Sequence, residues 1–151
     1  MKDELFSELK EKYPEVFEHC NYVSIDDGWF FIIDELCRFL SYEKFNLLDK
    51  KKYMLTRNPD TNEIIEIEKQ IEEESNKIPR ATQVKEKFGS LRFYVNKATD
   101  EQRNYISFAE AISGHICEKC GNKGKSYHVR WVKTLCPDHA RERYGDDANE
   151  A

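Results

Sequence analysis

Four residues near the C-terminus have the types and spacing of a metal site: Cys117, Cys120, Cys136 and His139. Two residues separate the members of each pair, and fifteen residues separate Cys120 from Cys136. Three thiolates and one imidazole fill a tetrahedral shell around Zn²⁺. This is the pattern of structural zinc sites, because a catalytic zinc keeps one position open for water. The spacing therefore predicts one structural zinc ion.

The residues beside these ligands favour the local geometry that such a site needs. Gly121 can adopt a positive φ, which lets the chain wrap around an ion. Pro137 fits the first position of a helix, so Cys136 is expected to cap that helix and to share one face of it with His139. The helix N-terminus also favours a thiolate charge. Residues 127–133 alternate as strand residues do, and knuckle, hairpin and helix together resemble a treble-clef zinc finger.

Two classes of metal enzyme fit this cluster poorly. A zinc deaminase needs a His-x-Glu before its Pro-Cys-x-x-Cys, and the sequence contains no His-x-Glu. An HNH nuclease also uses a treble clef, and His128 is reminiscent of its first catalytic histidine. However, only seven residues separate His128 from Cys136, too few for the usual connecting segment. We expect no enzyme and keep an HNH-like nuclease as an alternative; His115 and His128 are expected to be surface or strand residues.

Length and composition suit one soluble domain with a small metal-stapled appendage. The chain has 151 residues, 39% of them hydrophobic, and its longest apolar run, 29–33, is far too short to span a membrane. The N-terminus has no apolar signal region, so a cytoplasmic location is expected. Five cysteines, an odd number, argue for metal binding and against a disulfide framework. Cys20 and Cys37 are expected to be small buried hydrophobes.

Helical patterns dominate the first half of the chain. Apolar residues recur at helical spacing over 5–17, with Pro14 dividing the stretch. A second helix is expected over 29–40; its apolar residues cover nearly every face, which predicts a central buried element. The region 50–78 is charge-rich, and Asp60 with Glu63 predicts a capping box for a peripheral helix.

The segment 82–95 alternates between apolar and polar residues, which predicts a β-hairpin with a turn at Gly89-Ser90. Val84 and Phe88 are expected on its buried face. Glu86 would lie between them, so we expect it to pair with a cation or to lie at the sheet margin. A further helix is expected from Thr99 to Gly114. The outward face of the hairpin would hold Lys85, Lys87, Arg92 and Tyr94.

These elements predict an α+β fold in which a helical N-terminal half packs on a small antiparallel hairpin. We expect a core over 1–114 with a charged insertion at 50–78, a zinc module over 115–145 and a frayed tail over 146–151. Charge is unevenly spread: residues 1–76 hold 10 Lys/Arg against 19 Asp/Glu, whereas 77–151 hold 14 against 10. This unequal distribution of charge has two interpretations. Either an acidic and a basic face bind different partners, or two solvated faces differ in the sign of their net charge.

Four stretches of the sequence form a recognisable set: Asp27-Gly28-Trp29, the run from Gln83 to Tyr94, Ile116-Cys117-Glu118-x-Cys120-Gly121 and Trp131-Val132-Lys133-Thr134-Leu135-Cys136-x-x-His139-Ala140. Together they are similar to a family of small uncharacterised proteins encoded by bacteriophages, prophages and bacteria. The resemblance covers most of the chain except 50–78. It implies a phage or bacterial origin, and hence the cytoplasm of a bacterial host, and a zinc site, but no known activity. Val129-Arg130-Trp131 stands where the family often has Gly-Gly-Trp.

Three functional hypotheses follow. The first is a non-enzymatic, zinc-stabilised binding protein, a phage or prophage accessory factor that engages a bacterial host protein. The second is direct binding of nucleic acid through the basic hairpin and the zinc module, although the lysines and arginines of an edge strand can also serve solubility alone. The third is the HNH-like nuclease. The candidate contact residues for nucleic acid or a protein partner are Lys85, Lys87, Arg92, Tyr94, Lys123, Lys125, Arg130 and Lys133.

Overall fold

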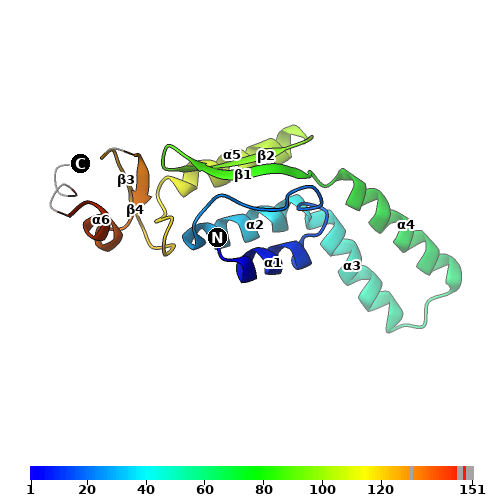
Figure 1. The fold of residues 1–151 in the computed structure, drawn as a ribbon. Coiled ribbons are helices and arrows are strands. Elements are labelled where there is room, and N and C mark those ends of the chain that lie inside the picture. The colour runs from blue at the N-terminus through cyan, green and yellow to red at the C-terminus, as the bar shows by residue number, and fades with distance from the viewer. Residues whose placement is uncertain (130, 146–147, 149–151) are drawn as a thin grey trace.

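The computed structural model describes residues 1–129, 131–145 and 148, and these residues form the predicted α+β fold (Figure 1). A central body carries a helical arm at one end and the cysteine-rich module at the other. The elements are α1 (Asp3–Lys12), η1 (Asp27–Trp29), α2 (Phe30–Leu40), α3 (Tyr42–Leu55), α4 (Thr61–Lys77), β1 (Ala81–Lys87), β2 (Ser90–Val95), α5 (Asp100–Ser113), β3 (Lys125–Tyr127), β4 (Lys133–Leu135) and α6 (Pro137–Tyr144).

The body is built around one apolar core that joins α1, α2, α5 and the β1–β2 hairpin. Twenty buried residues form this core, and Leu9, Trp29, Ile33 and Leu91 within it are fully buried. Removing a side chain of this size from water stabilises a fold by roughly 1.5–3 kcal/mol. Cys20 and Cys37 belong to the same core, as predicted.

Both edges of the β1–β2 hairpin are covered. Along β1, the Ser24 N–H donates to the Val84 carbonyl at 2.9 Å, and the Glu86 N–H donates to the Ser24 carbonyl at 2.9 Å. Along β2, the Leu91 N–H donates to Ser113 Oγ and the Phe93 N–H to a Glu110 carboxylate oxygen, each at 2.8 Å. The hairpin therefore presents no open edge at these positions to another strand.

The turn of this hairpin differs from the prediction. Lys87 pairs with Ser90, so the two turn residues are Phe88 and Gly89 rather than Gly89 and Ser90. Both have positive φ, 53° and 74°, as a type I′ turn requires. Phe88 therefore leaves the apolar face on which alternation placed it, and it is 69% exposed.

The prediction that α2 is buried on nearly every side was also wrong. Ile33, Leu36 and Cys37 face the core, but Phe31 and Phe39 are 74% and 45% exposed. Helix α5 covers only part of α2, and its own Phe108 is 68% exposed. One apolar face shared by the two helices is therefore open to solvent.

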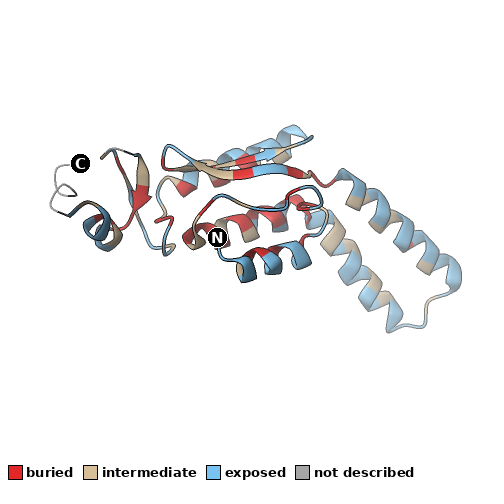
Figure 2. Cartoon of the chain, in the orientation of Figure 1, coloured by how far each residue is buried: buried red, intermediate tan, exposed pale blue. Residues whose placement is uncertain are grey.

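The charge-rich region forms an antiparallel pair of helices, α3 and α4, that projects from the body (Figure 2). Helix α3 has no buried residue and α4 has one, Ile67, so the arm is peripheral as predicted. Asp60 and Glu63 form the predicted capping box. The arm begins at Tyr42, before the predicted start at residue 50. Neither arm helix, nor any other described helix, is long and apolar enough to cross a membrane.

Candidate metal centre

The four predicted ligands converge on one point. Their donor atoms all lie within 4.8 Å of one another. Cys120 Sγ and Cys136 Sγ are 3.8 Å apart, and Cys117 Sγ lies 3.5 Å from His139 Nδ1. A tetrahedral zinc with its usual bond lengths gives edges of about 3.8 Å between two sulfurs and about 3.5 Å between sulfur and nitrogen. These residues therefore fit a single tetrahedral metal ion.

Local backbone geometry holds the first ligand pair in place. Gly121 has a φ of +77°, as predicted, and its N–H donates to the Cys117 carbonyl at 2.9 Å. The Cys117 N–H in turn donates to the Asn122 carbonyl at 2.7 Å. These two bonds close the chain into a tight turn beneath Cys117 and Cys120.

The second ligand pair opens a helix. Cys136 is the N-cap of α6 and Pro137 follows at its first turn, which confirms both predictions. Cys136 Sγ lies 3.1 Å from His139 Nδ1 on the same helical face. The short β3–β4 hairpin joins this helix to the knuckle, in the order expected of a treble clef. Alternation predicted a strand over 127–133, but among the described residues of that range only Tyr127 and Lys133 lie in strands.

The cysteines differ in how easily they ionise. Burial opposes ionisation of Cys136, but hydrogen bonds from His139 and from the other two cysteines lower its pKa to about 7. Burial raises the pKa of Cys120 to about 11, and the neighbouring thiols add to the rise. A metal binds thiolates, so its binding must release protons from this cluster. His115 and His128 are exposed and are not part of the four-residue cluster found in the described chain.

A contact that the sequence analysis did not predict joins this module to the body. The Gly28 N–H donates to the Glu118 carbonyl at 2.9 Å, and Trp29 Nε1 donates to the Ile116 carbonyl at 2.8 Å. A Cβ at position 28 would lie 2.2 Å from the Cys117 carbonyl oxygen, so only glycine fits there. The turn that carries Cys117 and Cys120 therefore packs directly against Gly28 and Trp29. The one feature of the sequence that could have indicated this contact was a glycine at the start of an apolar helix.

An internal ion-pair network strengthens the same junction. Lys133 Nζ lies 2.8 Å from Glu86 Oε2 and 2.9 Å from Glu118 Oε1, and Glu118 is 1% exposed. Burial would lower the pKa of Lys133, but its hydrogen bonds to the two carboxylates raise it. Burial raises the pKa of Glu118 despite the lysine. Of the two expectations for Glu86, a cation partner or a place at the sheet margin, the structure shows the cation partner. Lys133 joins the two parts of the chain rather than standing free on the surface.

The other candidate contact residues lie on two elements. Lys85 and Arg92 are cross-strand partners, and Tyr94 and Lys87 share their face, as predicted. Lys85 Nζ lies 5.6 Å from the centre of the Tyr94 ring. Lys123 and Lys125 are exposed on the metal module, where Lys125 Nζ lies over Tyr127. Arg130, also predicted, lies outside the described residues.

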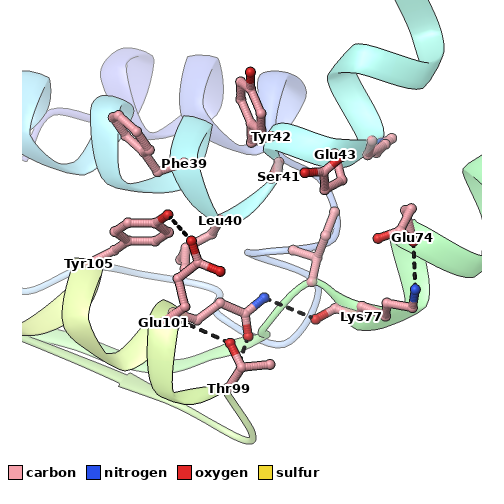
Figure 3. Close-up of a pocket in the computed structure, with 13 residues that line it drawn as sticks. Phe39, Leu40, Ser41, Tyr42, Glu43, Glu74, Lys77, Thr99, Glu101 and Tyr105 are labelled. Carbon is pink, nitrogen blue, oxygen red and sulfur yellow. Dashed lines mark hydrogen bonds and ion pairs between the residues drawn. The ribbon is translucent and has the colours of Figure 1, made fainter.

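A cavity of about 340 Å³ lies where the arm joins the body (Figure 3). Several of its polar groups contact one another: Lys77 contacts Glu74 at 2.6 Å, and the Tyr105 hydroxyl donates to Glu101 at 2.5 Å. No histidine or cysteine is among the described residues that line it.

A second hollow, of about 410 Å³, is apolar and lies between α2 and α5. Its walls carry the side chains that these helices leave open to solvent. We call it the α2–α5 groove, and it is lined by Phe31, Ile32, Glu35, Leu36, Phe39, Tyr105, Phe108, Ala109 and Ile112.

Comparison with family models, with curated proteins and with solved structures found no match for this chain. The geometry of its own residues shows three cysteines and a histidine that can hold one metal ion, in a module docked on an α+β body.

Proposed function

We propose that this chain is a non-enzymatic binding protein that a zinc ion stabilises and that engages another protein. Zinc is the favoured ion because three thiolates and an imidazole in tetrahedral arrangement select it over harder cations. The four donors fill that tetrahedral shell, so the site's role is to hold the knuckle and α6 together. A structural ion of this kind leaves binding to the surfaces that it supports.

The observation that carries the proposal is the α2–α5 groove. Phe31, Phe108 and Ile112 line it and are 74%, 68% and 38% exposed, although each is large and apolar. Contiguous exposed apolar surface of this kind marks a site of protein interaction. Two roughly aligned helices with a hollow between them suit one occupant, the apolar face of an amphipathic helix.

The charge of this chain indicates which charged side chains the partner helix should carry. The half of the chain that carries α2 has a net charge of 10 − 19 = −9. Among the described residues that line the groove, Glu35 carries the one charge, and Arg38 pairs with it at 2.6 Å. We infer from the net negative charge of this half of the chain, rather than from the groove lining, that the occupant is a helix whose apolar stripe is flanked by lysine or arginine. The resemblance to phage and prophage proteins supports a bacterial host protein as the partner.

The experiment is affinity capture from a bacterial lysate, with and without nuclease, using three forms of the tagged chain. The wild type should retain a stoichiometric protein after nuclease treatment. Phe108→Asp should lose that protein while keeping its metal content and its thermal unfolding midpoint. Tyr53→Asp is the matched control, because Tyr53 is an exposed aromatic, 62% exposed, on the arm. Equal capture by the wild type and Phe108→Asp would refute the groove as the docking site, and self-capture would assign it to a second copy.

A further inference from the structure

Phe88 is a residue type that is disfavoured at its position in the β1–β2 turn. It occupies the first central position of a type I′ turn with a φ of +53°, where asparagine is favoured and a bulky side chain is strained. Its ring is 69% exposed, so burial in the core does not offset the strain. Residues held against local preference, without a packing reason, are concentrated at functional sites.

A second aromatic ring stands beside it. Trp131 is 76% exposed and lines the same groove of about 470 Å³ as Phe88, together with Val132. The Tyr144 hydroxyl donates to the Trp131 carbonyl at 3.0 Å and so holds the backbone at this point. The tip of the β1–β2 hairpin and the loop before β4 thus each present an exposed ring at this groove. A hydrogen bond holds the two elements together, because the Thr134 hydroxyl donates to the Gly89 carbonyl at 2.6 Å.

The groove between these rings is cationic. Its lining holds Lys87, Lys133 and Arg143 against Glu86, a net charge of 3 − 1 = +2. Lys133 neutralises Glu86 at 2.8 Å, whereas Lys87 and Arg143 are exposed. The basic face of the hairpin, with Lys85 and Arg92, continues away from the groove. Cations that follow a groove walled by exposed aromatic rings suit a chain of phosphates that carries unpaired bases.

We propose that this groove binds single-stranded nucleic acid, with bases stacked on Phe88 and Trp131 and phosphates beside Lys87 and Arg143. Stacking requires access to a ring face, which an unpaired base offers and a base inside a duplex does not. The site is separate from the α2–α5 groove, so it stands whether or not that groove binds a protein.

The direct test is titration of the zinc-loaded chain with a fluorescein-labelled 15-nucleotide oligo-dT at low salt. Fluorescence anisotropy reports binding. Intrinsic fluorescence reports the site, since the chain has two tryptophans and Trp29 is fully buried. We expect saturable binding together with quenching of the Trp131 emission. Absence of binding at low salt would overturn the proposal.

Two variants separate this role from a structural one. Trp131→Ala and Phe88→Asn should each weaken binding by about tenfold, the effect of losing one stacked base. Phe88→Asn should also leave the unfolding midpoint equal or higher, because asparagine suits the turn. A purely structural Phe88 would give the opposite result, a lower midpoint with unchanged binding. Tyr53→Ala, on the distant arm, is the control and should bind as the wild type does.

Salt dependence tests the phosphate contacts. Lys87→Ala should reduce the slope of log Kd against log salt by about 0.7, the value for one phosphate of a single strand. Binding that is insensitive to salt, or equal affinity for the wild type, Trp131→Ala and Phe88→Asn, would refute the site. Release of the oligonucleotide by a co-purified protein that itself contacts Trp131 would instead assign the surface to a protein partner.

Discussion

The body and the metal module of this molecule are stabilised by different means. The body buries twenty residues in one apolar core, whereas the apolar cluster of the module has five, and two of those, Cys117 and Cys136, belong to the candidate metal site. A unit as small as 115–144 cannot remove enough apolar surface from water to offset the entropy of ordering its chain. Under the proposed function, a bound metal would supply in the module what apolar packing supplies in the body.

The two regions nevertheless meet through close backbone contacts. Gly28 of the body and Gly121 of the module face each other, and a Cβ at either position would lie 3.1 Å or less from backbone of the other region. The ion pair between Lys133 of the module and Glu86 of the body adds to this junction. Loss of the metal should therefore loosen the module first and weaken the body only through this junction.

The largest expected effect is unfolding of the module while the body stays folded. Removing the metal with a chelator, or replacing Cys117 by serine, should unfold the module, since structural zinc contributes on the order of 10 kcal/mol of folding free energy in isolated fingers. Hydrogen exchange should show loss of protection over 115–144 and retained protection in α2 and β1–β2. Cys20→Ala is the control and should keep its metal. Unchanged metal content in Cys117→Ser would contradict the assignment of the ligands.

The next prediction concerns apolar packing in the body instead of the metal in the module. Ile33 is fully buried in the core, and Ile33→Ala should lower the free energy of unfolding by about 2–5 kcal/mol. Denaturant titration followed by circular dichroism measures this loss. The affinity for the metal in the folded protein should be unchanged. A matched loss of metal affinity would mean that the two regions fold as one unit.

The junction can be tested with a single methyl group. Gly28→Ala places a Cβ 2.2 Å from the Cys117 carbonyl, so the knuckle must shift, at a cost of about 1–3 kcal/mol. Thermal unfolding should show a lower midpoint and two separable transitions. Gly114→Ala is the control, because its Cβ would meet nothing closer than 3.4 Å. Equal midpoints for the two variants would show that the contact does not couple the regions.

The arm extends the comparison to a region with neither a large core nor a metal. Asp60 caps α4 with its side chain, and Asp60→Ala should cost about 1 kcal/mol. The loss should be confined to exchange protection in α3 and α4. A shift of the whole unfolding transition would show that the arm is part of the body's cooperative unit.

The smallest effect concerns pH at the edge of the junction. Burial opposes ionisation of Asp27, but hydrogen bonds from the backbone and side chain of Lys2 lower its pKa. The carboxylate therefore stabilises the fold above the unfolded pKa of about 3.9, and this contribution is lost as pH falls through the lower folded value. Asp27→Asn should reduce stability at pH 7, and its effect should shrink as pH falls below the unfolded pKa. An equal loss of stability above and below that pKa would mean that the charge is irrelevant.

Local features of this protein could be predicted from its sequence. The four ligands, the cap at Cys136 and the capping boxes at Asp60 and Thr99 all involve residues three positions apart or small side chains with narrow backbone preferences. The two faces of the hairpin follow from strict alternation. Such features depend on helix or strand geometry within a few residues, so one sequence is sufficient to find them.

Only the tertiary structure decided which faces are covered and which residues meet across the chain. Periodicity shows that Phe31 and Phe108 lie on apolar faces, but not that no other element covers them. Trp29 meets Ile116 across 87 residues, and Lys133 meets Glu86 across 47. Phe88 left its predicted face because the register placed it in the turn. Contacts of this kind depend on how the elements pack, and neither spacing nor composition contains that information.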